Sequence, residues 1–382
     1  MRIVVAPDSY KGSLSAVAVA SAMEQGILSV FPHAEVIKVP IADGGEGTVE
    51  ALVTATHGRI IHEEVTGPLG DPVQAFWGLL GDGETGVIEM AAASGLPLVP
   101  KDRRDPRITT TIGTGQLIKS ALDQGVRKLI IGIGGSATND GGAGMAQALG
   151  VKFLDAAGQE LPPGGAALAG LTAINLAGLD SRLIETTIMV ACDVDNPLCG
   201  PRGASAVYGP QKGATPAIIA ELDAALGQFA AIAKAATGKD IAELPGAGAA
   251  GGLGAGLLFF TNAQLRPGVE IVLETTSFAA IVKDAALVIT GEGNTDFQTA
   301  YGKAPVGVAK IAKQFNVPTV CLSGGLGKDH EKVLEHGING LMSILPHPMS
   351  LEECVASASP LVQSAAARLC RLIQIGSTIH NR

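Results

Sequence analysis

The segment TGEGNTDFQTAYGKAP (290–305) carries four side chains that could act on a charged ligand. Glu292 and Asp296 are candidates for a general base or a metal ligand, and Gln298 could hydrogen-bond to a substrate. Lys303 precedes a helix start with an early proline, where its ammonium could contact a phosphate. A salt-bridged surface loop would use the same residue types, so the composition of this segment alone does not distinguish a ligand site from a structural loop.

Two more polar loops follow short apolar runs near the N-terminus. The first, PDSYKGS, offers Asp8, Ser9 and Lys11, and the second, ADGGEGT, offers Asp43 and Glu46. The candidate substrate-binding residues of these segments are Asp8, Ser9, Asp43, Glu46, Glu292 and Gln298. Each lies between a predicted strand and a predicted helix, so both belong at the carboxyl edge of a parallel sheet, where such sheets bind ligands. A helix N-terminus also favours an anion. Ordinary capped turns are the alternative for each loop taken singly.

The longest glycine-rich loop is GIGGSATNDGGAG (132–144), which also joins a predicted strand to a predicted helix. Its backbone N–H groups could surround a phosphate. The candidate cofactor-binding residues are Gly134, Gly135, Ser136, Thr138, Asn139, Asp140, Gly141 and Gly142.

The same loop partly matches the dinucleotide fingerprint through Gly132, Gly134 and Ala137, with Asp155 about 20 residues further on. We favour phosphate or substrate binding over NAD, because the following strand ends in a hairpin-like turn and polar residues crowd the loop. Another candidate segment is ACDVDNPLCG, where Asp193 and Asp195 stand two apart after a predicted strand. Two carboxylates at that spacing share a face of extended backbone and could hold Mg²⁺, although an Asn-Pro turn is equally compatible.

Composition excludes several classes of protein. The 382 residues are 47% hydrophobic and 16% charged, which provides for a large core and argues against global disorder. A net charge of -9 does not suit a general nucleic-acid binder. Five cysteines without a CxxC pair favour reduced thiols in a cytoplasmic protein, and we expect neither a signal peptide nor a membrane span. A mean hydropathy of +0.33 leaves room for a self-association surface, and so for a homo-oligomer.

The order of elements predicts an α/β protein. Strands and helices alternate at both ends of the chain, whereas the middle reads as hairpins followed by a long amphipathic helix over about 215–236. We therefore predict a flavodoxin- or Rossmann-like doubly wound domain of parallel strands from residues 1–60 and 268–382. Residues 61–267 are predicted to form an inserted α+β domain.

Motifs spread over nearly the whole chain resemble those of the bacterial glycerate kinases. They are APDSYKGSLSA, PIADGGEGT, GIGGSATNDGGAGMAQALG, ACDVDNPLCG, YGPQKGA, GAGAAGGLGAGL and TGEGNTDFQTAYGKAPVGVAK. The resemblance implies ATP- and Mg²⁺-dependent phosphorylation of D-glycerate on its 2-hydroxyl, giving 2-phosphoglycerate. It also implies a flavodoxin-like domain with an inserted second domain. One departure is that Asn294 and Thr295 stand where the family reads Arg and an apolar residue.

Phosphoryl transfer needs a held nucleotide, positive charge near the moving group and a carboxylate near the attacking hydroxyl. We expect Lys11 and Lys303 to supply the positive charge. The base and the metal ligands are expected among Asp43, Glu46, Asp193 and Asp296, and spacing alone does not choose between them. Two other functions stay open: an NAD-dependent oxidoreductase of small hydroxy acids, and a non-catalytic metabolite sensor derived from a kinase.

Overall fold

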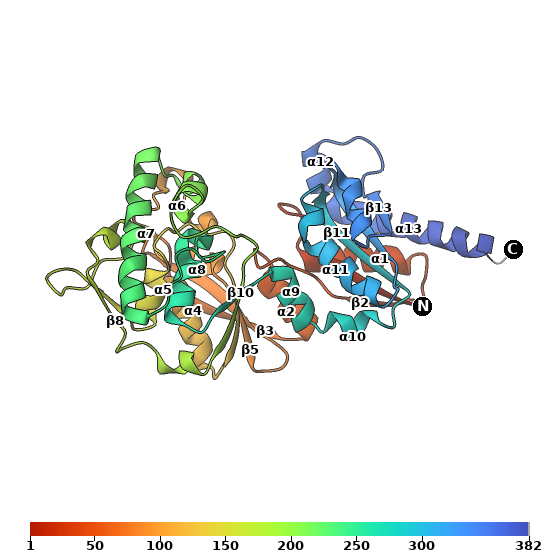
Figure 1. Ribbon diagram of the computed structural model, residues 1–382. Coiled ribbons are helices and arrows are strands. Elements are labelled where there is room, and N and C mark those ends of the chain that lie inside the picture. Colours follow the sequence, from red (N-terminus) through yellow and green to blue (C-terminus); the bar gives the residue numbers. More distant parts are fainter. Residues whose placement is uncertain (381–382) are drawn as a thin grey trace. The chain divides into compact units, whose positions relative to one another are not determined.

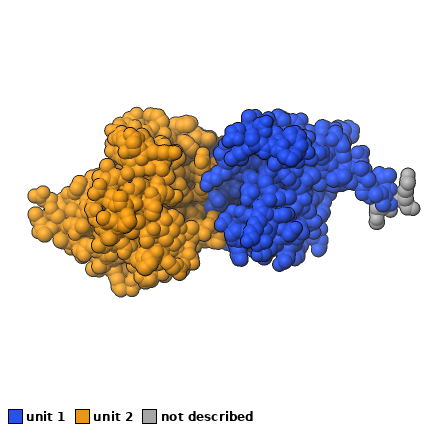
Figure 2. All heavy atoms as spheres, turned by 90° about the horizontal axis from the view of Figure 1, so that it is seen from above, with its two compact units in different colours: residues 1–43, 50–57, 269–382 blue, residues 44–49, 58–268 orange. Residues whose placement is uncertain are grey.

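The computed structural model describes residues 1–380 and divides into two compact units (Figures 1 and 2). Unit 1 comprises residues 1–43, 50–57 and 269–382, and unit 2 comprises residues 44–49 and 58–268. Residues 44–49 therefore fold with unit 2, whereas the sequence placed everything up to residue 60 in the first domain. Gly44 packs closely on Ala191 of unit 2, where any side chain larger than hydrogen would overlap the alanine.

Unit 1 is built from both ends of the chain. Its elements are β1 (Arg2–Pro7), α1 (Ala16–Leu28), β2 (Glu35–Lys38), α2 (Thr48–Thr56, beginning in unit 2), α9 (Gly268–Thr275), α10 (Phe278–Val282), β11 (Leu287–Thr295), η6 (Thr299–Tyr301), α11 (Ala304–Gln314), β12 (Thr319–Leu326), η7 (His330–His336), β13 (Gly340–Ser343), α12 (Leu351–Ala356) and α13 (Ala358–His380).

The five strands of unit 1 form a parallel sheet in the order β13-β12-β11-β1-β2. Renumbered along the chain this is the flavodoxin-like order 2-1-3-4-5, which confirms the predicted α/β class. The direction in which successive strands are added to the sheet reverses between β1 and β11. Ligands are therefore expected at the carboxyl ends of those two strands.

Helices cover both faces of this sheet. Ile3, Val5 and Leu322 face a cluster that contains buried residues of α1 and α13. On the opposite face Cys321 packs with Val306 of α11. Because both faces are covered, the central strands carry continuous buried apolar runs, IVVA in β1 and LVI at the start of β11.

Unit 2 holds the inserted elements. They are β3 (Arg59–Thr66), β4 (Pro72–Leu79), β5 (Thr85–Glu89), α3 (Ala91–Ser94), η1 (Leu96–Leu98), η2 (Lys101–Arg103), α4 (Ile112–Asp123), β6 (Lys128–Gly132), α5 (Ala143–Ala148), β7 (Lys152–Leu154), η3 (Ala166–Gly170), β8 (Ala173–Asn175), η4 (Ser181–Ile184), β9 (Thr187–Ala191), α6 (Ala204–Tyr208), η5 (Pro210–Lys212), α7 (Pro216–Thr237), α8 (Ala249–Phe260) and β10 (Gln264–Arg266).

The main sheet of unit 2 has the order β10-β9-β6-β5-β4-β3. The β3–β4 and β4–β5 pairs are antiparallel, as the closely spaced turns predicted. The pairs from β5 to β10 are parallel, which gives this sheet a second carboxyl edge with its own loops. A separate ribbon joins β7 to β8.

The predicted long helix is α7. Thr215 caps its N-terminus by accepting a hydrogen bond from the Ile218 N–H at 3.4 Å, and Gly238 ends it in a left-handed conformation. Its length and apolar composition would suffice to cross a membrane. Buried side chains including Leu222 and Phe229 instead pack one face into the core of unit 2, which is how a core helix of a folded domain behaves.

Candidate active site

Polar side chains collect at the carboxyl edge of the unit 1 sheet, at its switch point. The Asp8 N–H donates to the carbonyl of Gly291 at 2.8 Å, so the chain leaving β1 stays beside β11. Strand β11 runs on to Thr295, paired with β12. The stretch from Glu292 to Thr295 is therefore strand, although the sequence predicted a loop.

Asp8 is the most strongly perturbed carboxyl group on this edge. Partial burial, together with the charges of Asp43 and Glu292, raises its pKa to about 7, and a hydrogen bond from the Ser9 N–H at 2.6 Å opposes that shift. A carboxylate that titrates near neutral pH matches the requirement for a general base. The sequence had placed Asp8 and Ser9 among substrate-binding residues and had sought the base elsewhere.

Glu292 lies buried below this edge. Its Oε1 accepts hydrogen bonds from the Thr295 and Thr299 hydroxyls, at 3.0 and 2.7 Å. Burial raises the pKa of Glu292, while the two hydroxyls and the charge of Lys303 counteract the shift. The Thr295 hydroxyl thus donates a hydrogen bond to Glu292 that the apolar residue of the family pattern could not make.

The Asp296 carboxylate organises its own loop. Oδ1 accepts from the Gln298 N–H at 2.9 Å, and Oδ2 accepts from the Asn294 side chain at 3.2 Å. Gln298 and Lys303 are exposed, and Lys303 stands at the N-cap position of α11. These contacts favour a positioning role for Asp296.

Lys11 is brought next to β11. A Cβ at Gly293 would be in ordinary van der Waals contact with the backbone of Tyr10 and Lys11, so the turn after β1 lies close to β11. Lys11 itself is exposed. Unit 1 therefore presents Asp8, Lys11 and the β11 residues on one edge, as the sequence predicted for these loops.

Asp43 and Glu46 belong to different units. Exposed Asp43 ends the first segment of unit 1, and its charge acts on Asp8. Exposed Glu46 belongs to unit 2. A side chain at Gly134 would meet the Cα of Gly45, so the Glu46 loop lies against the glycine-rich loop.

The glycine-rich loop divides into two parts. Gly134 and Gly135 are exposed, whereas Thr138, Asn139 and Asp140 are fully buried. The Asn139 amide donates to the Ser205 hydroxyl at 2.9 Å.

Intrachain donors occupy the oxygens of Asp140. Oδ2 accepts from the N–H and the hydroxyl of Thr111, at 2.8 and 2.9 Å, and from the Gly144 N–H at 3.2 Å. Side chains at Gly141 and Gly142 would meet Phe229 and Gly256 respectively. In this conformation only the first part of the loop is open to a phosphate, so residues 138–142 do not form the cradle that the sequence predicted.

Sequence reasoning missed Lys212. It is fully buried, and its Nζ donates to the Ser136 hydroxyl at 2.7 Å and to the Thr138 carbonyl at 2.6 Å. Burial lowers the pKa of this ammonium to about 7, against the opposing charge of Asp140. The only signal in the sequence was the YGPQKGA motif. The motif does not reveal that its lysine contacts the glycine-rich loop, whose Ser136 is 76 residues earlier in the chain.

The two aspartates of the predicted metal pair have different partners. The Asp193 Oδ1 accepts from the Gly268 N–H at 3.0 Å, whereas Asp195 forms an ion pair with Arg202 at 3.0 Å. The exposed side chain of Asp195 and its cationic partner do not fit a magnesium ligand. Within residues 1–380 no group of three or more His, Cys, Asp or Glu side chains could hold a metal ion by itself.

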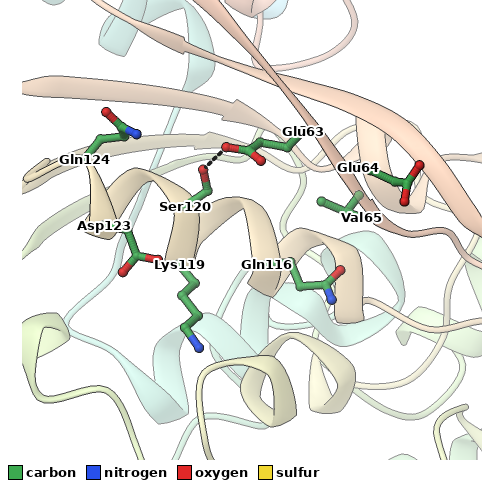
Figure 3. A pocket seen from close by; sticks show the side chains of 8 residues that line it. All are labelled: Glu63, Glu64, Val65, Gln116, Lys119, Ser120, Asp123 and Gln124. Carbon is green, nitrogen blue, oxygen red and sulfur yellow. Dashed lines mark hydrogen bonds between the residues drawn. The ribbon is translucent and has the colours of Figure 1, made fainter.

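A shallow surface pocket lies elsewhere on unit 2 (Figure 3). It is lined by Glu63, Glu64, Val65, Gln116, Lys119, Ser120, Asp123 and Gln124. The Ser120 hydroxyl donates to Glu63 at 2.6 Å. Its carboxylates outnumber its one lysine, so the pocket is poorly suited to an anionic substrate.

The fold and this edge define an α/β protein with a flavodoxin-like sheet and a group of carboxylates, including Asp8 and Glu292, at its switch point. The glycerate kinase family model matches residues 3–374. The glycerate kinase of Bacillus subtilis (strain 168) is 55% identical over 99% of both chains. The glycerate 2-kinase of Escherichia coli (strain K12) is 51% identical over 98% of this chain and 99% of its own.

A solved structure shows the same architecture. The crystal structure assigned to glycerate kinase 2 of Salmonella typhimurium LT2 superposes with a TM-score of 0.91 at 52% identity, and covers 99% of both chains. This chain belongs to the glycerate kinase family.

Proposed function

We propose that this protein transfers the γ-phosphoryl group of ATP to the 2-hydroxyl of D-glycerate, in the cytoplasm, giving 2-phospho-D-glycerate and ADP. The chain belongs to the glycerate kinase family, and one observation carries the proposal. Asp8 lies at the switch point of unit 1, where burial and the charges of Asp43 and Glu292 raise its pKa to about 7. Asp8 accepts the hydroxyl proton as the bond from oxygen to phosphorus forms. The bond from that phosphorus to the departing ADP oxygen breaks.

Positive charge near the substrates comes from Lys11 and Lys303. Both are exposed on the edge that carries Asp8. Their ammonium groups neutralise the carboxylate of glycerate or the phosphates of the nucleotide. In unit 2, exposed Gly134 and Gly135 allow backbone to approach an anion closely, and we propose this first part of the loop as the phosphate contact.

Mg²⁺ is proposed to accompany the nucleotide. In such sites it keeps several waters and takes one or two protein carboxylates in addition to substrate phosphates. Asp43, exposed and near Asp8, suits this role better than Asp193 and Asp195. The ion would neutralise phosphate charge.

The direct test is a coupled assay for ADP with D-glycerate, followed by NMR of the product to separate 2- from 3-phosphoglycerate. We expect glycerate-dependent ADP release and the 2-isomer. ADP release without the 2-isomer would refute the assigned position, and no glycerate-dependent release would refute the kinase activity and favour a non-catalytic sensor.

Asp8→Asn tests the base. We expect kcat to fall by about 10²–10⁴-fold, and kcat/KM of the native protein to rise as pH passes about 7, because the base must be ionised. Asp193→Asn and Asp296→Asn should cost less, since these carboxylates hold backbone groups. A near-native rate for Asp8→Asn, with a large loss in either comparison variant, would move the base to that residue.

The structure gives no support to the oxidoreductase alternative. A dinucleotide site needs its acidic residue after the next parallel strand. Asp155 instead follows β7, which forms a two-stranded antiparallel ribbon with β8. Its Oδ1 accepts from the Ala157 and Gln159 N–H groups of its own turn at 2.8 and 2.9 Å. Quenching of nicotinamide fluorescence on mixing would revive this function.

A further inference from the structure

Lys212 makes an unusual set of contacts for a buried lysine. A buried ammonium ordinarily pairs with a carboxylate. The hydrogen-bond acceptors of its Nζ are instead two uncharged oxygens, the Ser136 hydroxyl and the Thr138 carbonyl. The oxygens of nearby Asp140 are held by Thr111 and by backbone N–H groups. The charge of Lys212 is therefore directed at the glycine-rich loop.

Ser136 links this lysine to the open part of the loop. It follows exposed Gly134 and Gly135 and is itself 7% exposed. A hydroxyl has one proton to donate and two lone pairs. Because Ser136 Oγ accepts from Lys212, its own proton points away from the ammonium and can be donated to a ligand.

The backbone around Ser136 is fixed by the segment after α3. The Leu96 N–H donates to the Gly135 carbonyl at 2.8 Å, and the Ala137 N–H donates to the Ser94 carbonyl at 2.9 Å. Because the backbone on both sides of Ser136 is held, this residue loses little conformational freedom when a ligand binds. That is the condition for a preorganised contact.

We propose that Lys212 is a positioning residue, which turns the Ser136 hydroxyl toward an anionic oxygen group of a substrate and places positive charge beneath it. This inference rests on the proposed function. The anionic group is either the carboxylate of the acceptor or a phosphate of the nucleotide, and both present the same oxygen chemistry. The lowered pKa of Lys212 is consistent with this role, since a bound anion favours the charged form.

The test compares Ser136→Ala, Lys212→Met and the double variant. We expect each single variant to raise KM for one substrate by about 10–100-fold with a smaller change in kcat. Ser136→Ala removes the hydrogen bond to the anion, and Lys212→Met removes the group that orients the Ser136 hydroxyl. The double variant should be no worse than the more severe single variant, since Lys212 acts through Ser136. A rise in KM for D-glycerate identifies the carboxylate, and a rise for ATP identifies a phosphate.

Lys239→Met is the matched control. Lys239 also donates to two carbonyls of unit 2, those of Leu258 and Thr261, at 2.8 and 2.7 Å. It should leave both KM values unchanged. Equal effects of Lys239→Met and Lys212→Met, or additive effects in the double variant, would overturn the proposal.

Two outcomes need separate readouts. If Lys212→Met does not fold, Ser136→Ala decides, because it keeps the lysine; native KM values for both substrates would then refute the inference. If the native protein does not phosphorylate glycerate, the proposed function fails but binding can still be measured. Calorimetry of D-glycerate and of ATP with the native protein and Ser136→Ala then replaces KM, and equal affinities would refute the role of Lys212.

Discussion

Asp8 affects catalysis and stability in opposite directions. Its pKa is raised to about 7 in the folded protein from an ordinary value of 3.8. Between these two values the folded state binds more protons than the unfolded state, so the free energy of unfolding falls as pH rises through that window. The ionised form that serves as a base is thus the form that destabilises the free protein.

Replacing Asp8 with Asn should therefore stabilise the protein at high pH. We expect the gain in free energy of unfolding at pH 8 to exceed the gain at pH 5 by about 2–3 kcal/mol, because at pH 5 the native carboxyl is already protonated. Urea denaturation at the two pH values measures this. A gain that is the same at both would show that Asp8 is not perturbed in the folded state.

Asn294 offers a second residue-scale test. Its amide donates to Asp296 on the exposed end of β11. Asn294→Arg restores the charge of the family pattern beside Asp296, and we expect KM for an anionic substrate to fall about two- to fivefold, the usual worth of an exposed charge. Asn294→Gln, which adds no charge, is the control, and steady-state kinetics is the measurement. An equal change in both variants would exclude a charge effect.

The residue types of the unit 1 site could be predicted, but their roles could not. Asp8, Lys11, Glu292 and Lys303 follow from strand–loop–helix order, which brings them to one edge. What distinguishes Asp8 is partial burial beside two other carboxylates, and what distinguishes Lys212 is complete burial. Neither property is local in sequence.

At the scale of elements, two glycine-rich segments fit against each other. Helix α8 contains a left-handed turn at residues 250–252, and the Gly251 carbonyl accepts from the Gly141 N–H at 3.0 Å. Side chains at Gly251 and Gly252 would meet the backbone of Thr138 and Gly141. The GAGAAGGLGAGL motif thus serves to pack the buried part of the loop.

Gly251→Ala should destabilise unit 2 by about 2–4 kcal/mol, because the new methyl group overlaps backbone at a positive φ of 67°. Gly227→Ala is the matched control, since its site in α7 is open and exposed, and it should stabilise by about 0.5–1 kcal/mol. Chemical denaturation measures both. A loss below 0.5 kcal/mol for Gly251→Ala, on the order of a neutral surface change, would contradict this packing role.

Elements were predicted best where their signals were local. The strand β1 and the helix α7 show apolar runs or capping residues that act over a few positions. The extension of β11 through Gly293 and Asn294 was missed because these residues are poor strand formers. Pairing with β12, including Asn294 opposite Gly325, holds them extended, and that partner is distant in sequence.

At the scale of the whole molecule, each unit has its own core, and unit 2 also carries a fluorescent reporter. The single tryptophan, Trp77, is fully buried in unit 2. In unit 1, α1 packs closely on α13, where a side chain at Gly26 would overlap the Gln363 carbonyl and Ala366. The two cores can therefore be perturbed and observed separately.

Gly26→Ala should lower the melting temperature of unit 1 by about 3–10 °C, from an overpacking cost of about 1–3 kcal/mol. Circular dichroism should show an early transition while Trp77 fluorescence keeps its native midpoint. Gly376→Ala, at an open position of α13, is the control and should move neither signal downward. Equal shifts of both signals would mean that the units unfold as one.

The central place of β1 has a consequence for synthesis on the ribosome. Strand β1 ends at Pro7, but its neighbour β11 begins only at Leu287. At about 5–20 residues per second, roughly 15–60 s separate the emergence of the two strands. Unit 2 is complete before then, so the unit that begins the chain finishes folding last. During that interval the apolar segment RIVVA has no β11 to pair with, so the sheet of unit 1 can close only after most of the chain has been made.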